Sequence, residues 1–271
     1  MKILATDLDR TLLPNGSWKA DDTAIGLFNE LTEQQGVLVV YVTGRNLSLT
    51  ERAIEEFGVR FPDVLCGDVG TTIRKRENGG WTFDHGWAAH VRRSSPRWDA
   101  DAVREAVAGV DGLREQEREH LNQFKQSYYV DLEKQDAVMG RVNGLVAGKF
   151  DEVVVYSVDL PAHKGLIDVL PNSATKQTAL EYVAEAQKTP KDQVVFCGDS
   201  GNDIFPLTAG FAGVLVRNAD DQLVANVRSA MADNPALKVY FAKGEFKGLS
   251  GYYTSGVIEG AYHYGVLRDA E

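Results

Sequence analysis

The chain has 271 residues, enough for one large domain or for a core domain and a smaller one. Hydrophobic residues make up 44% of it and charged residues 25%, which is usual for a globular protein. Its formal net charge of -10 argues against nucleic acids and membrane surfaces as partners, because the field of an acidic protein repels polyanions.

The first part of the chain alternates between predicted strands and helices. Strands are expected, in chain order, over residues 3–6, 37–42 and 63–66. The run 37–42 is continuously apolar and rich in β-branched residues, as a parallel strand covered on both faces should be. The first helix is expected to begin at a cap formed by Asp21 or Asp22 and to end at Gly36. A second helix is expected over residues 48–57, and this order predicts a doubly wound parallel sheet.

The pattern then changes. The turn Asn78-Gly79-Gly80 predicts a hairpin between strands at 71–76 and 81–84. Further helices are predicted over 101–108 and 136–146, and further strands over 126–132, 152–157 and 166–170. Hairpins mixed with helices predict an antiparallel sheet that is covered on one face.

From about residue 175 the alternation returns. The predicted elements are a helix through Leu180, a strand at 193–197, a short helix from Asn202, a strand at 211–216, a helix through Leu223 and a last helix at 257–264. The predicted fold class is therefore α/β, with a doubly wound, Rossmann-like parallel-sheet core and an inserted α+β domain. We expect the core to comprise residues 1–83 and 169–271, and the insertion residues 84–168.

Targeting signals and cysteine pairs are not evident. The N-terminus enters a strand pattern without a signal-peptide layout, and the longest apolar run, 37–42, is too short to cross a bilayer. Cys66 and Cys197 lie far apart and are interpreted as small buried side chains. We therefore expect a cytoplasmic protein with no membrane partner, and a monomer is compatible with the sequence.

Two carboxylates, Asp7 and Asp9, follow the first predicted strand directly. Ligands of an open parallel sheet bind beyond the carboxyl ends of its strands. Residues two apart in an extended segment point the same way, so this pair could hold a hard cation or act on a phosphoryl group. A surface turn rich in Asp is the alternative.

Two more segments are expected at the same edge of the sheet. Thr43-Gly44-Arg45 ends the second apolar strand, where a hydroxyl and free backbone N–H groups could bind phosphate oxygens. An ordinary strand-to-helix turn would also explain it. Gly198-Asp199-Ser200-Gly201-Asn202-Asp203 ends a later strand and adds two carboxylates and an amide. Lys176, in a first helical turn, opposes the helix dipole, which an anionic partner would explain.

Taken together and in this order, these segments resemble the four motifs of the haloacid dehalogenase superfamily. The insertion between the second and third motifs is similar to the C2-type cap of that superfamily, and the resemblance covers nearly the whole chain. It implies a Mg²⁺-dependent phosphatase in which Asp7 is the nucleophile, forming an aspartyl-phosphate, and Asp9 is the general acid and base. It further implies phosphate binding by Thr43, Gly44, Lys176 and Asn202. The implied Mg²⁺ ligands are Asp7, the backbone carbonyl of Asp9, Asp199 and Asp203, with Asn202 nearby.

A finer resemblance is to the sucrose-phosphate phosphatase branch. It rests on the segments 124–129, 168–171, 197–203, 214–219 and 256–263. It implies hydrolysis of a small sugar phosphate, with sucrose 6-phosphate as the first choice and mannosylfructose phosphate as the alternative. Arg10 departs from the pattern, since relatives more often carry Gly or Asn there.

Substrate selection is expected in the cap. Arg45, Lys125 and Tyr128 are the candidate substrate contacts, although strand packing would also account for Lys125 and Tyr128. The five histidines lack metal-ligand spacing and are interpreted as structural or surface residues: His85, His90, His120, His163 and His263. Two further hypotheses remain open. One is a non-catalytic module that binds a sugar phosphate; the other is a mutase with a second phosphate site at Arg92, Arg93 and Arg97.

Overall fold

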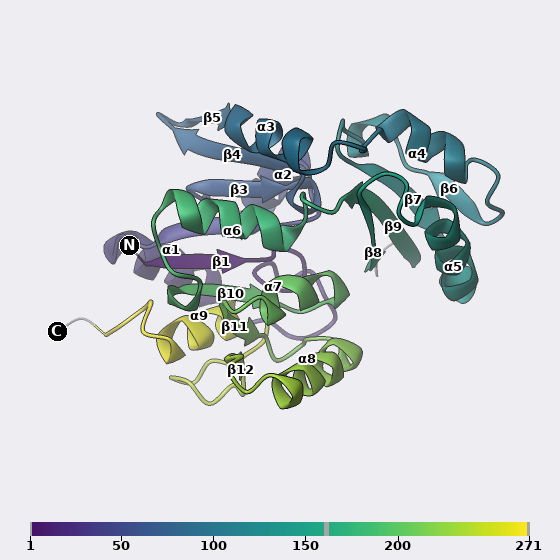
Figure 1. Ribbon diagram of the computed structural model, residues 1–271. Coiled ribbons are helices and arrows are strands. Elements are labelled where there is room, and N and C mark those ends of the chain that lie inside the picture. The colour runs from purple at the N-terminus through teal and green to yellow at the C-terminus, as the bar shows by residue number, and fades with distance from the viewer. Residues whose placement is uncertain (1, 160–162, 270–271) are drawn as a thin grey trace.

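A computed structural model describes residues 2–159 and 163–269. Over these residues the strands form one sheet of eight strands, the large sheet, and one of four, the small sheet. Figure 1 shows the small sheet and its helices standing to one side of the large sheet. The predicted α/β class, with a second α+β unit inserted into the chain, is confirmed.

The large sheet has the strand order β12-β11-β10-β1-β2-β3-β4-β5. Its strands are β1 (Ile3–Thr6), β2 (Leu38–Val42), β3 (Val64–Gly67), β4 (Thr72–Glu77), β5 (Gly80–Phe83), β10 (Val194–Gly198), β11 (Ala212–Leu215) and β12 (Val239–Phe241). The pairs from β12 to β3 are parallel, and the β4–β5 hairpin adds an antiparallel edge. The predicted hairpin therefore extends the large sheet.

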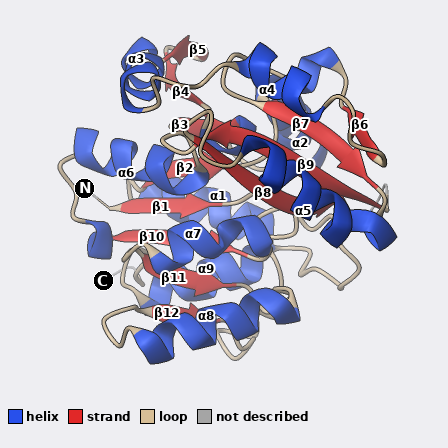
Figure 2. Cartoon of the chain, turned by 45° about the vertical axis from the view of Figure 1, so that its right-hand side comes forward, coloured by secondary structure: helices blue, strands red, loops and turns tan. Residues whose placement is uncertain are grey.

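Helices cover both faces of the large sheet (Figure 2). One core cluster holds residues of α1 (Ala24–Gln34), α2 (Leu47–Phe57) and α9 (Thr254–His263). The other holds residues of α3 (His85–Ser94), α6 (Lys176–Ala186), α7 (Ile204–Thr208) and α8 (Asp221–Asp233). Neighbouring strand residues point to opposite faces, so Ile3 and Ala5 belong to the second cluster and Leu4 to the first. Burial on both faces explains why these strands are apolar throughout.

The small sheet is antiparallel, with the strand order β6-β7-β9-β8. Its strands are β6 (Leu113–Glu115), β7 (Gln126–Val130), β8 (Glu152–Asp159) and β9 (Lys164–Pro171). Apolar residues of α4 (Ala100–Val107) and α5 (Gln135–Val146) pack on one of its faces. This agrees with the predicted antiparallel sheet covered on one face.

Helix α3 was not predicted, and it belongs with the large sheet. Its Trp87 is fully buried, and the indole N–H donates to the carbonyl of Gly70 at 3.1 Å. The small sheet begins only at Leu113. The division of the chain near residues 84 and 168 stays a proposal, with α3 packed on the core side of it.

The expected cap of the first helix is wrong. Thr23 occupies the cap position of α1 and makes no side-chain capping bond. The Asp21 carboxylate instead accepts from the backbone N–H of Ser250 at 2.8 Å and from the hydroxyl of Ser255. The Asp21 side chain, which the local sequence pattern assigns to the helix cap, is thus bound in a tertiary contact instead. Among the described residues, no helix has the length and hydropathy to cross a membrane.

Candidate active site

The predicted motif residues meet at one edge of the large sheet. Strands β10, β1 and β2 lie side by side and in register, with Thr6 opposite Cys197 on one side and Tyr41 on the other. Asp7 and Asp199 therefore leave the sheet next to each other, although 192 positions separate them in the chain (199 − 7). The Asp7 N–H donates to the Cys197 carbonyl at 2.9 Å and extends the pairing past the strand end.

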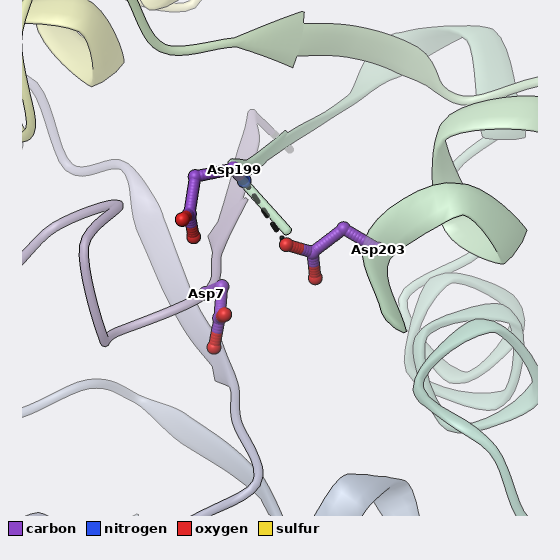
Figure 3. A group of neighbouring side chains, drawn as sticks. All are labelled: Asp7, Asp199 and Asp203. Carbon is purple, nitrogen blue, oxygen red and sulfur yellow. Dashed lines mark hydrogen bonds between the residues drawn. The ribbon is translucent and has the colours of Figure 1, made fainter. Parts of the chain in front are cut away.

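Three buried carboxylates lie close together at this edge. Oxygen atoms of Asp7, Asp199 and Asp203 all lie within 4.8 Å of one another. Figure 3 shows these side chains approaching one small region from the ends of β1 and β10 and from the turn after β10. Their relative exposures are only 5%, 0% and 0%, so their charges are poorly screened by solvent.

Lys176 supplies the positive charge of this group. Its ammonium lies 3.1 Å from Asp7 Oδ2 and 2.8 Å from Asp203 Oδ1, and it also donates to Asn202 Oδ1 at 3.1 Å. Its position in the first turn of α6 was the anomaly that suggested an anionic partner, and these partners account for it. Burial acts to lower the pKa of Lys176, but the charges of Asp203 and Asp7 outweigh it and hold the pKa above its usual value.

The carboxylates themselves are hard to ionise together. Burial raises the pKa of Asp7 to about 7, against the opposing effect of Lys176. Burial and the nearby charge of Asp203 also raise the pKa of Asp199. Lys176 and the Arg10 guanidinium, 3.3 Å from Asp199 Oδ2, bring two positive charges to three carboxylates, so the group has room for further positive charge.

The geometry of Asp199 fits a cation at this place. Its Oδ1 accepts from the Thr11 hydroxyl at 2.8 Å. Its Oδ2 is buried and has no hydrogen bond among the described residues, and it makes an ion pair with Arg10 Nε at 3.3 Å, so it has capacity for a further cation contact. Buried, converging carboxylate oxygens are the ligands that Mg²⁺ prefers.

Asp203 contributes mainly by holding the turn after β10. Its Oδ2 accepts from the backbone N–H groups of Asp199 at 3.0 Å and of Ser200 at 3.2 Å, and the first of these bonds is drawn in Figure 3. Gly198 has no room for a side chain, because a Cβ there would lie 2.7 Å from Asp203. The glycine thus permits the close turn that brings Asp203 beside Asp199.

Asp9 is bound differently from Asp7. Arg45 donates to both of its oxygens, from Nε to Oδ2 at 2.8 Å and from Nη2 to Oδ1 at 2.7 Å, and Asn15 donates to Oδ1 at 2.6 Å. Partial burial acts to raise the pKa of Asp9, but the Arg45 hydrogen bonds and charge outweigh it, so the net shift is downward. Arg45 therefore contacts a predicted catalytic carboxylate directly, although it was predicted as a substrate contact.

The turn after β2 places Gly44 and Arg45 toward the site but not Thr43. Thr43 is fully buried, and its hydroxyl accepts from the Arg45 N–H at 3.1 Å. Gly44 and Arg45 line the cavity described next, and Thr43 is not among its lining residues.

A cavity of about 460 Å³, the central cavity, lies between the two sheets. It is lined by these predicted site residues: Asp7, Asp9, Gly44, Arg45, Lys125, Asp199 and Asn202. Lys176 and Asp203 do not line it, but Lys176 contacts two residues that do, Asp7 and Asn202, and Asp203 contacts Lys176. Arg92, Arg93 and Arg97 are not among its lining residues either.

The small sheet contributes the opposite wall of the central cavity. Lys125 is buried and lies 4.0 Å from Asp168, which also accepts from the Ser127 hydroxyl. Tyr128 does not reach the cavity, because it is buried in the cluster beneath α4 and α5. The next residue, Tyr129, has its side chain on the opposite face of β7 and lines the cavity.

Sequence reasoning missed several residues of the cavity wall. They include Asn15, Gln116, His120, Tyr129, Ser157 and Asp168. His120, interpreted as structural or surface, lies in a short 3-10 helix, Arg118–His120, that carries no motif. The residue types of Pro14-Asn15-Gly16 predict a turn, but they do not predict that Asn15 contacts Asp9.

Comparison with known proteins agrees with this arrangement. The family model described as sucrose-6F-phosphate phosphohydrolase matches residues 1–265. A HAD-like hydrolase of Nitrosococcus oceani is 35% identical over 264 residues, covering 97% of this chain and 71% of that protein. Mannosylfructose-phosphate phosphatase of Agrobacterium fabrum is 26% identical, with 98% of each chain covered.

Length and structure add to the comparison. Sucrose-phosphatase 1 of Nicotiana tabacum is 27% identical over 242 residues, and the chain spans only 54% of its length. The solved structure of the sucrose-phosphatase of Synechocystis, in complex with sucrose and phosphate, superimposes with a TM-score of 0.79 at 25% identity. That similarity covers 97% of this chain and 98% of the other, so it includes both sheets.

Proposed function

The chain belongs to the sucrose-6F-phosphate phosphohydrolase family, a family of sugar phosphatases, and from this premise we propose that it hydrolyses the phosphomonoester of a disaccharide. Sucrose 6-phosphate is the first-choice substrate, giving sucrose and phosphate. The observation that carries the proposal is the convergence of Asp7, Asp199, Asp203 and Lys176 at one place, where Asp7 and Asp199 line a cavity whose other wall comes from the small sheet.

In the proposed reaction, a carboxylate oxygen of Asp7 attacks phosphorus and the bond to the sugar oxygen breaks. The Lys176 ammonium, 3.1 Å from Asp7, would stay beside the phosphoryl group and balance part of its charge. Water then attacks the aspartyl-phosphate, releases phosphate and restores Asp7. Since phosphoryl transfer depends mainly on positioning and charge neutralisation, a buried cluster of this kind suits it.

Asp9 is the proposed proton carrier. Arg45 favours the ionised form of Asp9 in this structure, so Asp9 would take up a proton before it donates one to the departing sugar oxygen. It would later take a proton from the attacking water. Its position on the cavity wall and its three hydrogen bonds from Arg45 and Asn15 support a fixed orientation. Arg45 is accordingly proposed to orient Asp9.

Mg²⁺ is the proposed cofactor. Asp7, the Asp9 carbonyl, Asp199 and Asp203 would hold it, with Asn202 nearby. The specific support for a cation there is the buried Asp199 Oδ2, which has an ion pair with Arg10 but no hydrogen bond among the described residues. When bound, the ion would withdraw charge from the phosphoryl oxygens. Thr43, Gly44, Lys176 and Asn202 remain the proposed phosphate contacts, of which Thr43 has the weakest support because its hydroxyl is buried.

Lys125 is the proposed sugar contact, and Tyr129 takes the role first assigned to Tyr128. Both line the central cavity on the wall formed by the small sheet, opposite the large sheet that carries the carboxylates. The Tyr129 hydroxyl already donates a hydrogen bond to Glu117 at 2.8 Å, so it would contact the sugar as an acceptor or in exchange for that bond. The core of residues 1–83 and 169–271 would thus perform the chemistry, and the cap domain of residues 84–168 would select the sugar. A cytoplasmic location is in keeping with the free thiols of Cys66 and Cys197.

A substrate panel tests the proposed function. Phosphate release is measured with Mg²⁺ on sucrose 6-phosphate, mannosylfructose phosphate, glucose 6-phosphate and fructose 6-phosphate. Sucrose 6-phosphate should have the highest kcat/KM. Faster turnover of mannosylfructose phosphate would support the alternative substrate, and equal turnover of simple hexose phosphates would overturn the disaccharide claim. Absence of turnover on every ester would favour a binding module.

A further inference from the structure

Arg10 is held in an unusual backbone conformation beside the proposed metal ligands. Its φ of 57° is in the left-handed region, which non-glycine residues adopt at a cost. Its N–H donates to Asn15 Oδ1 at 2.7 Å, and its carbonyl accepts from Asn218 Nδ2 at 2.6 Å. These two bonds fix the direction in which the long side chain leaves the loop.

The Arg10 guanidinium bridges two carboxylates from different segments. Nε lies 3.3 Å from Asp199 Oδ2, and Nη2 donates to Asp220 Oδ1 at 2.6 Å. Asp199 Oδ2 is the buried oxygen that has no hydrogen bond in the described part of the chain. Asp220 is tied to the same place, since its N–H donates to the Asp199 carbonyl at 2.8 Å.

The chain therefore puts a permanent positive charge next to the oxygen that we propose for Mg²⁺. The Arg10 side chain is 17% exposed and lines the central cavity, so solvent screens its charge only in part. The carboxylate of Asp220, 44% exposed, offsets some of that charge.

We propose that Arg10 is a positioning residue that weakens divalent-cation binding at Asp199 through its charge, and that Asp220 sets how strongly it does so. The Arg10 cation repels a second cation bound beside it. Neutralising Arg10 then strengthens metal binding, and removing the Asp220 carboxylate, which leaves the Arg10 charge uncompensated, weakens it. If the Arg10–Asp220 ion pair only held the structure together, removing either partner would shift Mg²⁺ affinity in the same direction.

This inference rests on the proposed metal site, and calorimetric titration of the full chain with Mg²⁺, in the absence of substrate, tests it. Arg10→Gln, which keeps a polar side chain with an N–H donor but is shorter and uncharged, should bind Mg²⁺ about tenfold more tightly than the parent chain. Arg10→Lys, which keeps the charge, should bind within about threefold of it. Asp220→Asn should bind several-fold more weakly.

Arg228→Gln is the matched control, because it removes one positive charge from exposed α8 and should leave affinity unchanged. Thermal unfolding without metal reports whether each variant is folded. Weaker Mg²⁺ binding in both Arg10→Gln and Asp220→Asn, or unchanged affinity in Arg10→Gln, would overturn the proposed role. Failure of the parent chain to bind Mg²⁺ would overturn both this role and the proposed metal site.

Discussion

Arg45 donates to both carboxylate oxygens of Asp9, from Nε at 2.8 Å and from Nη2 at 2.7 Å. Such a two-pronged contact fixes a carboxylate in orientation as well as in charge, which a lysine cannot do. The same arginine also donates to the Leu49 carbonyl in α2 at 3.1 Å, so Asp9 is anchored to a helix of the core.

Arg45→Lys should therefore lower kcat while leaving metal affinity unchanged. General acid–base catalysis contributes about 10²- to 10⁴-fold, and loss of orientation at Asp9 should remove about 10- to 100-fold of it. Arg52→Lys, an exposed change on the same helix, is the control. Steady-state kinetics on sucrose 6-phosphate would measure the effect, and an unchanged kcat would rule out the orienting role.

Metal affinity should depend on pH through Asp7. In the absence of metal, the pKa of Asp7 is raised to about 7, so this carboxyl is largely protonated below pH 7. A cation binds only the ionised form and releases the proton. Mg²⁺ affinity should fall by about tenfold or more per pH unit below pH 7, because protonation of Asp199, whose pKa is also raised, acts in the same direction. Titrations at pH 6, 7 and 8 would measure this, and a pH-independent affinity would contradict it.

Lys125→Met should separate sugar recognition from phosphate chemistry. A hydrogen bond from a charged group is worth about 1.5–3 kcal/mol, so KM for sucrose 6-phosphate should rise about 10- to 100-fold. Turnover of p-nitrophenyl phosphate, which carries no sugar, should not change. Lys134→Met on the exposed surface is the matched control. An equal loss on both substrates would show that Lys125 acts on the phosphate or on the fold.

Tyr128→Phe should stabilise the protein. The Tyr128 hydroxyl is buried and has no hydrogen-bond partner among the described residues, so its removal should raise the free energy of unfolding by about 1 kcal/mol. Tyr41→Phe is the contrast, because the buried Tyr41 hydroxyl donates to the Arg60 carbonyl at 2.6 Å. That change should lower the free energy of unfolding by about 1 kcal/mol. Equilibrium urea unfolding would measure the free energy of unfolding of both variants. Destabilisation of both would contradict the claim that the Tyr128 hydroxyl makes no hydrogen bond.

Much of the core could be predicted from the sequence because its strands are buried on both faces. A run such as 37–42 has one plausible structure, and parallel strands that end at the same edge bring Asp7 and Asp199 together whatever the loops do. An unfavourable charge at a helix start predicted an anionic partner for Lys176, and the structure identifies Asp7 and Asp203 as those partners.

The cavity wall from the small sheet was harder to predict. Both faces of β7 are covered, since Gln126, Ser127 and Tyr128 are all buried. Its sequence therefore does not alternate between apolar and polar residues in a way that marks the face toward the cavity. For this reason Tyr128 was predicted as the substrate contact in place of Tyr129. Strands β6 and β12 have three residues each, too few for a period to be visible. Asn15 lies on a loop and His120 in a single-turn 3-10 helix, and only the tertiary fold brings them to the cavity.

The most direct test of the phosphatase mechanism is phosphate release from sucrose 6-phosphate by the parent chain and by Asp7→Asn, each with Mg²⁺ and with a chelator. The parent chain should release phosphate only when Mg²⁺ is present, and the folded Asp7→Asn variant should release none above background. Turnover by Asp7→Asn at a rate near that of the parent chain would contradict nucleophilic attack by Asp7.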